Sequence, residues 1–163
     1  MRFALIKTAS VSVCALALTC SSAQQSARQN TRILFICEHG NVKSLMAASY
    51  FNKLAQQRGL PYRAIARGTD PNSTTVPPAI IKGLGAEGVD VSSFHPLKLR
   101  NSDIARSARV ITIGVELPRN ARNQAQTRLE QWYDVPPASM DYLGAQRSLK
   151  EHVAMLIDEL ASQ

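Results

Sequence analysis

The chain has 163 residues, 45% of them hydrophobic and 19% charged, which is enough to bury one core and no more. We therefore expect a single domain. Its 19 Lys and Arg outnumber 12 Asp and Glu, giving a formal net charge of +7 that suits an anionic substrate. The cations are scattered, with no basic run interleaved with aromatic residues, so we expect no nucleic acid partner.

Residues 1–23 have the layout of a secretory signal peptide. Arg2 and Lys7 precede an apolar run over residues 8–19, and small residues follow it. The run is too short for a good membrane span. We therefore expect cleavage near Gln24 and export to the periplasm or the exterior, with no stable membrane insertion after signal cleavage.

Two alternatives to a cleaved signal peptide stay open. The segment could instead form an N-terminal helix packed on the domain. A lipoprotein would be processed at Cys20, although Thr19 before it is a poor match to the small residue that such processing needs.

The predicted mature chain has two parts. Residues 24–31 are polar and unpatterned, which indicates a flexible terminus, and residues 32–163 form the expected domain. Loss of the signal segment removes two basic and no acidic residues, so 17 Lys and Arg would face 12 Asp and Glu. It also removes Cys14 and Cys20. Cys37 is then the only thiol, which excludes an internal disulfide.

The most informative stretch is residues 32–54. Its four apolar residues at 33–36 have the length and β-branched content of a buried strand, and they lead directly into Cys37. From Ser44 onward the apolar residues follow the spacing of an amphipathic helix. Residues 37–43 therefore form the predicted loop between strand and helix.

This loop and the first helical turn combine a thiol with groups that bind anions. Gly40, Asn41, Lys43 and the Ser44 hydroxyl all lie within eight residues of sequence. Unpaired backbone N–H groups and the helix dipole add positive potential at a helix N-terminus. A thiol in such surroundings ionises readily and becomes a nucleophile facing a bound oxyanion.

These residues resemble a known family. Cys37, five further residues, Lys43 and Ser44 are similar to the Cys-x5-Arg-Ser loop of low-molecular-weight protein tyrosine phosphatases and of the arsenate reductases that share their fold. The resemblance covers about Ile33 to Leu160. Segments that look more like the reductase branch are His39, residues 45–51, residues 66–69 followed by 76–79, residues 88–92 and residues 96–99.

The resemblance implies a role for each residue of the loop. Cys37 would attack phosphorus, Ser44 would steady the thiolate, and Lys43 would hold the oxyanion. The backbone N–H groups of the loop would complete the oxyanion-binding set, which is Glu38, His39, Gly40, Asn41, Val42 and Lys43. His39 has a second interpretation as an exposed loop residue, and both stay open.

Three departures from the family pattern bear on the chemistry. The first is Lys43, because a lysine keeps the charge of the family's arginine but cannot clamp an oxyanion with two parallel hydrogen bonds. The Gly-Asn order also differs, since the phosphatases place this pair one position earlier in the loop. The second departure is Gly114, at the position where thioredoxin-coupled reductases carry a resolving cysteine. An intramolecular disulfide relay therefore cannot run, although an external thiol could still reduce arsenate.

The third departure concerns the general acid. Family members carry an aspartate just before a proline in a loop that begins with an aromatic residue, and residues 132–138 resemble that loop without the Asp-Pro pair. Asp134 is the nearest carboxylate and our candidate for the acid, and Asp141 follows it. Either would need a shifted loop register. The alternative, that Asp134 is a solvated loop residue, stays open.

The remaining chain alternates strands with helices. We expect a strand at residues 62–66, a helix from Pro77 to residue 84, a short strand or extended connection at 89–91, a brief helix at 101–108, a strand at 110–113 and a closing helix at 143–160. Such alternation implies a parallel sheet covered on both faces. The resemblance implies the α/β fold of that family, a three-layer sandwich around a four-stranded parallel sheet.

No cofactor is expected, and three scattered histidines with one cysteine offer no metal-ligand spacing. His95 and His152 receive no role. Three functions remain open: a phosphatase-like hydrolase of phosphomonoesters, an arsenate reductase that uses an external thiol, and a catalytically impaired oxyanion-binding relative. The implied partners are a phosphate-ester or arsenate substrate, with a phosphoprotein or an external thiol donor.

Overall fold

Strand β1 (Arg32–Cys37) lies inside the sheet, as its apolar run predicts. In the computed structural model, which describes residues 31–162, β1 pairs in parallel with β2 (Arg63–Gly68) on one side and with β3 (Arg109–Ile113) on the other. β4 (Leu129–Trp132) pairs in parallel with β3, so the strand order is β2-β1-β3-β4. The expected four-stranded parallel sheet is thus confirmed.

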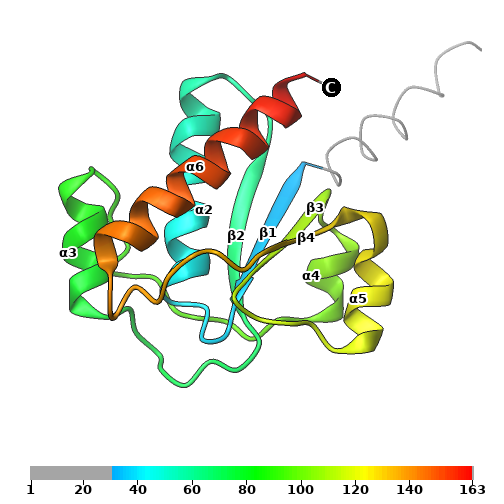
Figure 1. Ribbon diagram of the computed structural model, residues 1–163, viewed down its shortest axis with the longest axis horizontal. Coiled ribbons are helices and arrows are strands. Elements are labelled where there is room, and N and C mark those ends of the chain that lie inside the picture. The colour runs from blue at the N-terminus through cyan, green and yellow to red at the C-terminus, as the bar shows by residue number, and fades with distance from the viewer. Residues whose placement is uncertain (1–30, 163) are drawn as a thin grey trace, which may run out of the picture.

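Helices cover both faces of this sheet (Figure 1). One face packs against α2 (Lys43–Gln57), α3 (Pro78–Ala86) and α6 (Tyr142–Ala161), and it buries the odd-numbered side chains of β1. The other face packs against α4 (Asn101–Ala105) and α5 (Arg119–Ala125), and it buries Leu34 and Ile36. Because successive side chains of a strand point to opposite faces, an unbroken apolar run is what a doubly covered strand requires.

The α2 helix packs against the sheet and against α6, and this packing sets the direction of the helix away from the cysteine loop. Phe35 of β1 lies with its ring centroid 6.0 Å from that of Phe51 on α2 and 5.5 Å from that of Trp132 on β4. All three side chains are buried. Tilted aromatic contacts of this kind add to the stability gained from burial alone.

Two elements were not identified from the sequence. β4 is a four-residue edge strand in which only Trp132 is buried, so it lacks the apolar run that marks β1 and β3. α5, which is followed by the 3-10 turn η1 (Gln126–Arg128), buries only Ala121 and Ala125 and has no long apolar face.

Elsewhere the expected elements are present with shifted ends. β2 begins and ends later than expected, α4 is shorter, and residues 89–91 form the extended connection rather than the strand. The predicted signal peptide (residues 1–23) and all but the last residue of the predicted flexible terminus (24–31) lie outside the described residues. Between residues 31 and 162, no helix combines the length and the apolar content that crossing a bilayer requires.

The loop after β1 touches the end of β2 backbone to backbone. A Cβ on Gly68 would lie 2.7 Å from the His39 carbonyl carbon and 2.9 Å from the Gly40 nitrogen. Gly40 also has φ +77°, a conformation that favours glycine. Next to this contact the Thr69 N–H donates to the Cys37 carbonyl at 3.0 Å. Two glycines therefore let the loop fold tightly against the sheet.

A Gly68→Ala substitution should destabilise the protein because its methyl group would meet backbone atoms that cannot move aside. Overpacking of this kind costs about 1–3 kcal/mol in the free energy of unfolding. Gly85→Ala is the matched control: Gly85 lies in α3 with nothing within 4 Å of an added Cβ. That variant should be neutral or gain about 0.5–1 kcal/mol. Urea unfolding measures both, and equal effects would contradict the tight contact.

Candidate active site

The Cys37 sulfur lies at the carboxyl end of β1, where a ligand is expected to bind in a parallel α/β sheet. The residue is 4% exposed. Its Sγ lies 3.1 Å from the Ser44 Oγ and accepts a hydrogen bond from the Gly40 N–H at 3.3 Å. Ser44 is itself fully buried in the first turn of α2. These two contacts orient the sulfur, and both can donate to it when it is ionised.

The N-terminus of α2 supplies the positive end of the site. Val42 occupies the N-cap position without any capping hydrogen bond from a side chain. The helix's first backbone hydrogen bond runs from the Met46 N–H to the Val42 carbonyl at 2.8 Å. The N–H groups that precede Met46 in the helix have no acceptor one turn earlier within the helix, so they can bind an anion. The predicted cradle therefore faces the end of β1 that carries the thiol.

Side chains hold the loop from its outer side. The Asn41 Nδ2 donates to the Thr75 carbonyl at 3.0 Å, and Asn41 is almost fully buried. The His39 Nδ1 lies 3.0 Å from the Asp70 carbonyl, which can only accept, so we assign the proton to Nδ1. The other ring nitrogen, Nε2, then accepts from the Asn72 Nδ2 at 3.3 Å. Both ring nitrogens of His39 thus form hydrogen bonds with residues of the segment after β2.

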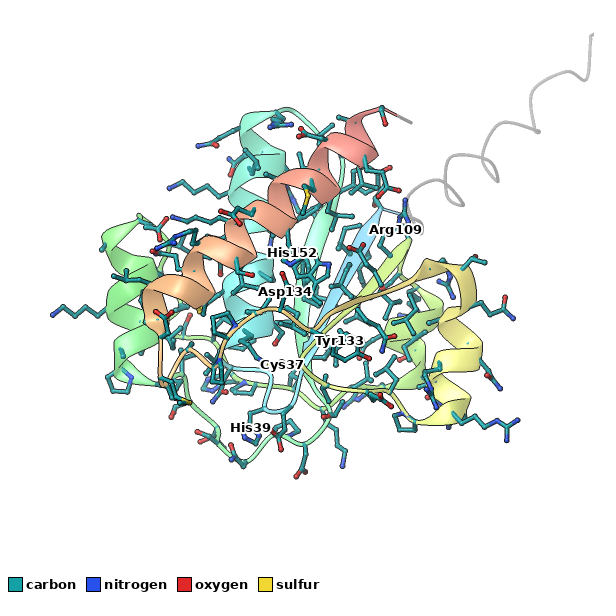
Figure 2. All side chains as sticks on the ribbon, in the orientation of Figure 1. Cys37, His39, Arg109, Tyr133, Asp134 and His152 are labelled. Atoms are coloured by element: carbon teal, nitrogen blue, oxygen red, sulfur yellow. The ribbon has the colours of Figure 1, made fainter. Side chains whose placement is uncertain are left out.

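Figure 2 shows Cys37 between His39 and His152 of α6. The neighbour of His39, Glu38, has a side chain that is 69% exposed, with Oε2 3.8 Å from the His39 Nε2. The hydrogen bonds of His39 hold the loop backbone in place, and His39 also lines the cavity beside Cys37, so both interpretations of His39 stay open.

A cavity of about 380 Å³ opens beside the thiol. It is lined by the cysteine loop, by the end of β3 and by the segment after β4: Cys37, Glu38, His39, Asn41, Val42, Lys43, Ile113, Gly114, Pro137, Ala138 and Ser139. A larger hollow of about 810 Å³ runs along the outer edge of β2, but Cys37 does not line it. Of the two hollows, the smaller one is therefore the one that the cysteine loop lines.

Lys43 extends across this cavity to the end of β3. A Cβ on Gly114 would lie only 2.5 Å from the Lys43 Nζ, so the ammonium group occupies the space that a side chain at position 114 would fill. Gly114 has φ +63° and donates its N–H to the Trp132 carbonyl at 3.0 Å. The predicted cation therefore lies beside Gly114, the position that the resemblance matches to the resolving cysteine of thioredoxin-coupled reductases.

Asp134 is placed with His152 rather than with the thiol. Its two carboxylate oxygens lie 2.8 and 2.9 Å from the His152 Nε2, and its side chain is 68% exposed. His152 in turn stacks on Trp132, with ring centroids 4.6 Å apart. Asp134 is not among the residues that line the cavity. Figure 2 shows Asp134 next to His152, apart from Cys37.

Asp141, the second candidate acid, also has another partner. Its Oδ1 accepts a hydrogen bond from the Gly144 N–H at 2.8 Å and caps the N-terminus of α6. The site thus joins Cys37, Ser44, Lys43 and the loop backbone, and the two aspartates lie outside the cavity lining.

The sequence analysis did not identify His152 as the residue that pairs with Asp134 and stacks on Trp132. One available signal was its position on α6 next to Val153 and three residues after Leu149, both buried core residues. Among residues 31–162, no three His, Cys, Asp or Glu side chains are grouped so that they could hold a metal ion.

The hydrogen bond from His152 lowers the pKa of Asp134 below its ordinary range. A depressed carboxyl pKa contributes stability above the unfolded-state value of about 3.9, and this contribution is lost as the pH falls through the folded-state value. A ¹³C NMR titration of the Asp134 carboxyl should show the low midpoint in the wild type and a rise towards the ordinary value in His152→Gln. An ordinary midpoint in the wild type would contradict the pairing.

Comparison with known proteins gives one family. The model of the family described as low molecular weight phosphotyrosine protein phosphatase matches residues 32–142. No curated protein matches the sequence.

Solved structures share the fold at low sequence identity. YfkJ from Bacillus subtilis is 15% identical with a TM-score of 0.68, and the match covers 82% of this chain and 96% of that one. An arsenate reductase in the phosphate binding state is 21% identical with a TM-score of 0.65, covering 80% and 98%. A low molecular weight protein tyrosine phosphatase from T. tengcongensis is 19% identical with a TM-score of 0.62, covering 82% and 99%.

Proposed function

The chain belongs to the low molecular weight phosphotyrosine protein phosphatase family, and we propose that it hydrolyses phosphomonoesters through a cysteinyl-phosphate intermediate on Cys37. The observation that carries this proposal is the buried Cys37 sulfur beside the N-terminus of α2. It has the Ser44 Oγ at 3.1 Å and the Gly40 N–H at 3.3 Å, and it opens into a cavity that Lys43 also lines. A positioned nucleophile and an anion cradle are the two parts that this chemistry needs.

In the first step, the thiol gives its proton to solvent and Sγ attacks phosphorus. An S–P bond forms, the P–O bond to the leaving group breaks, and its electron pair departs with the leaving oxygen. In the second step, water attacks phosphorus, the S–P bond breaks, and inorganic phosphate is released. The Ser44 hydroxyl steadies the sulfur when it leaves as a thiolate.

Charge develops on the phosphoryl oxygens during both steps. The N–H groups of the loop and of the first turn of α2 are fixed in place by the contacts of Asn41 and Gly40, so they need little reorganisation to bind those oxygens. Lys43 adds a positive charge from the side of β3. Because a lysine is a point donor, we expect weaker transition-state binding than an arginine would give.

Arsenate reduction with an external thiol is the second candidate. It is supported by the shared fold of the arsenate reductase whose structure holds phosphate, since arsenate and phosphate have the same shape and charge. Cys37 is the only cysteine between residues 31 and 162, so the electrons would have to come from a separate thiol such as glutathione or a glutaredoxin.

We also propose that the protein acts outside the cytoplasm, in the periplasm or secreted. The support is the succession of charged, apolar and small residues over positions 1–23. A mature chain with one cysteine cannot form an internal disulfide in an oxidising compartment, so its thiol is not consumed that way.

Turnover of 4-nitrophenyl phosphate by the purified protein tests the proposed hydrolysis. Cys37→Ser should reduce kcat by more than about a thousandfold, because removal of a nucleophile abolishes the covalent route. Equal turnover by wild type and Cys37→Ser would contradict it. A parallel assay with arsenate plus glutathione and glutaredoxin decides the alternative: arsenite release without ester cleavage would favour the reductase.

Lys43→Arg tests whether the point donor limits the rate. Gly114 has no side chain to compete with the group at the end of residue 43. Recovering one charged hydrogen bond of about 1.5–3 kcal/mol in the transition state should raise kcat roughly tenfold to a hundredfold. Lys43→Gln is the matched control and should lower kcat. A Lys43→Arg variant that gains phosphate affinity without turnover would favour the oxyanion-binding function.

A further inference from the structure

Two walls of the Cys37 cavity meet at Trp132, the last residue of β4. The Trp132 carbonyl accepts a hydrogen bond at 3.0 Å from the N–H of Gly114, which lines the cavity at the end of β3. The second wall is the segment that starts directly after Trp132, and its residues 137–139 line the cavity. Whatever holds this junction therefore bears on both walls, whereas the cysteine loop is held from the side of β2.

The helix α6 holds the segment after β4 through an aspartate at each end. At the start, the two carboxylate oxygens of Asp134 lie 2.8 and 2.9 Å from the His152 Nε2. At the end, the Asp141 Oδ1 accepts a hydrogen bond from the Gly144 N–H at 2.8 Å. His152 and Gly144 are eight residues apart on α6, which corresponds to about 12 Å along a helix. The wall is thus a span attached at two points to one helix.

This span has more length than its two attachments require. The seven residue steps from Asp134 to Asp141 can reach about 23 Å when extended, roughly twice the spacing of the attachments on α6. Between them, the Val135 side chain is buried in the core, and the Pro137 carbonyl accepts the N–H groups of Met140 and Asp141, each at 3.0 Å. The excess length therefore forms a turn, and the loss of one attachment should displace the part of it that lines the cavity.

His152 is itself held firmly enough to serve as an attachment. A carboxylate can only accept a hydrogen bond, so we assign the imidazole proton to Nε2. The ring stacks on the buried Trp132, with centroids 4.6 Å apart and planes 14° apart. Leu149 and Val153 are buried on the same stretch of α6 and fix its backbone against the core. The imidazole can therefore transmit the position of α6 to Asp134.

We propose that His152 is a positioning residue for the reaction at Cys37: by holding Asp134, it sets residues 137–139 at the cavity without touching the substrate. The inference rests on the proposed hydrolysis and adds a residue of α6 to it. The cysteine loop and the N-terminus of α2 bind the phosphoryl group, and the wall contacts the rest of the ester. Loss of the contact with Asp134 should therefore weaken binding of the ester and leave the binding of inorganic phosphate nearly unchanged.

Kinetics with 4-nitrophenyl phosphate test this role, with inorganic phosphate as the competitive inhibitor. His152→Phe keeps an aromatic ring to stack on Trp132 but removes the N–H, and Asp134→Ala removes its acceptor. Each should raise KM about tenfold while kcat and the inhibition constant of phosphate change by less than about twofold. Asp134→Asn keeps one accepting oxygen and should recover most of the loss seen in Asp134→Ala.

A double variant distinguishes the shared contact from a general weakening of α6. Because both substitutions break the same contact, combining His152→Phe with Asp134→Ala should raise KM no further than either does alone. Glu159→Gln is the matched control, since it breaks the ion pair of α6 with Arg109, which Figure 2 shows apart from Cys37. That variant should keep the wild-type KM. Thermal unfolding establishes that each variant is folded.

Alkylation of Cys37 by iodoacetamide gives a readout that needs no turnover. Cys37 is 4% exposed, so a displaced wall should open the thiol to the reagent. His152→Phe and Asp134→Ala should each be alkylated about tenfold faster than the wild type, and the double variant no faster than the singles. Glu159→Gln should react at the wild-type rate.

Three results would overturn the role of His152 while leaving hydrolysis at Cys37 intact. One is a KM in His152→Phe within about twofold of the wild-type value. Another is an equal rise in KM and in the inhibition constant of phosphate, because the cysteine loop rather than the wall would then be disturbed. The third is additive effects in the double variant. Coupled alkylation effects without any ester cleavage would instead reject the proposed hydrolysis, while the attachment of the wall by His152 stands.

Discussion

The backbone contact between Gly40 and Gly68 is the constraint on which the site depends. It turns the chain sharply after β1, so that the Gly40 N–H reaches the Cys37 sulfur and α2 begins with its N-terminus at the cavity. The contact is possible because neither residue has a side chain, and the pairing of residues 69 and 70 with the loop carbonyls secures it. Packing of α2 against β1 and α6 then holds the other end of the loop.

The distribution of charge around this loop is uneven. Lys43, the helix N-terminus and the loop N–H groups face the cavity, whereas the carboxylates of Asp134 and Asp141 have partners on or at the start of α6. Such a site favours binding of an oxyanion and the attack on it.

The fold and the centre of the site could be predicted because their signals are local. The apolar run of β1, the cysteine at its end and the amphipathic spacing of α2 are contiguous in the sequence. β4 and α5 could not, since one is a short edge strand and the other buries only two alanines. The partners of Asp134 and Lys43 were also inaccessible: His152 and Gly114 come from distant elements that only the three-dimensional packing brings to them.

The central claim is that the Cys37 sulfur carries the phosphoryl group during turnover. Acid quenching of the protein during cleavage of 2,4-dinitrophenyl phosphate, followed by mass spectrometry of its peptides, measures this directly. The account predicts the mass of one added phosphoryl group on the peptide that contains Cys37. A phosphoryl group on any other residue, or continued turnover with Cys37 unmodified at every quench time, would contradict it.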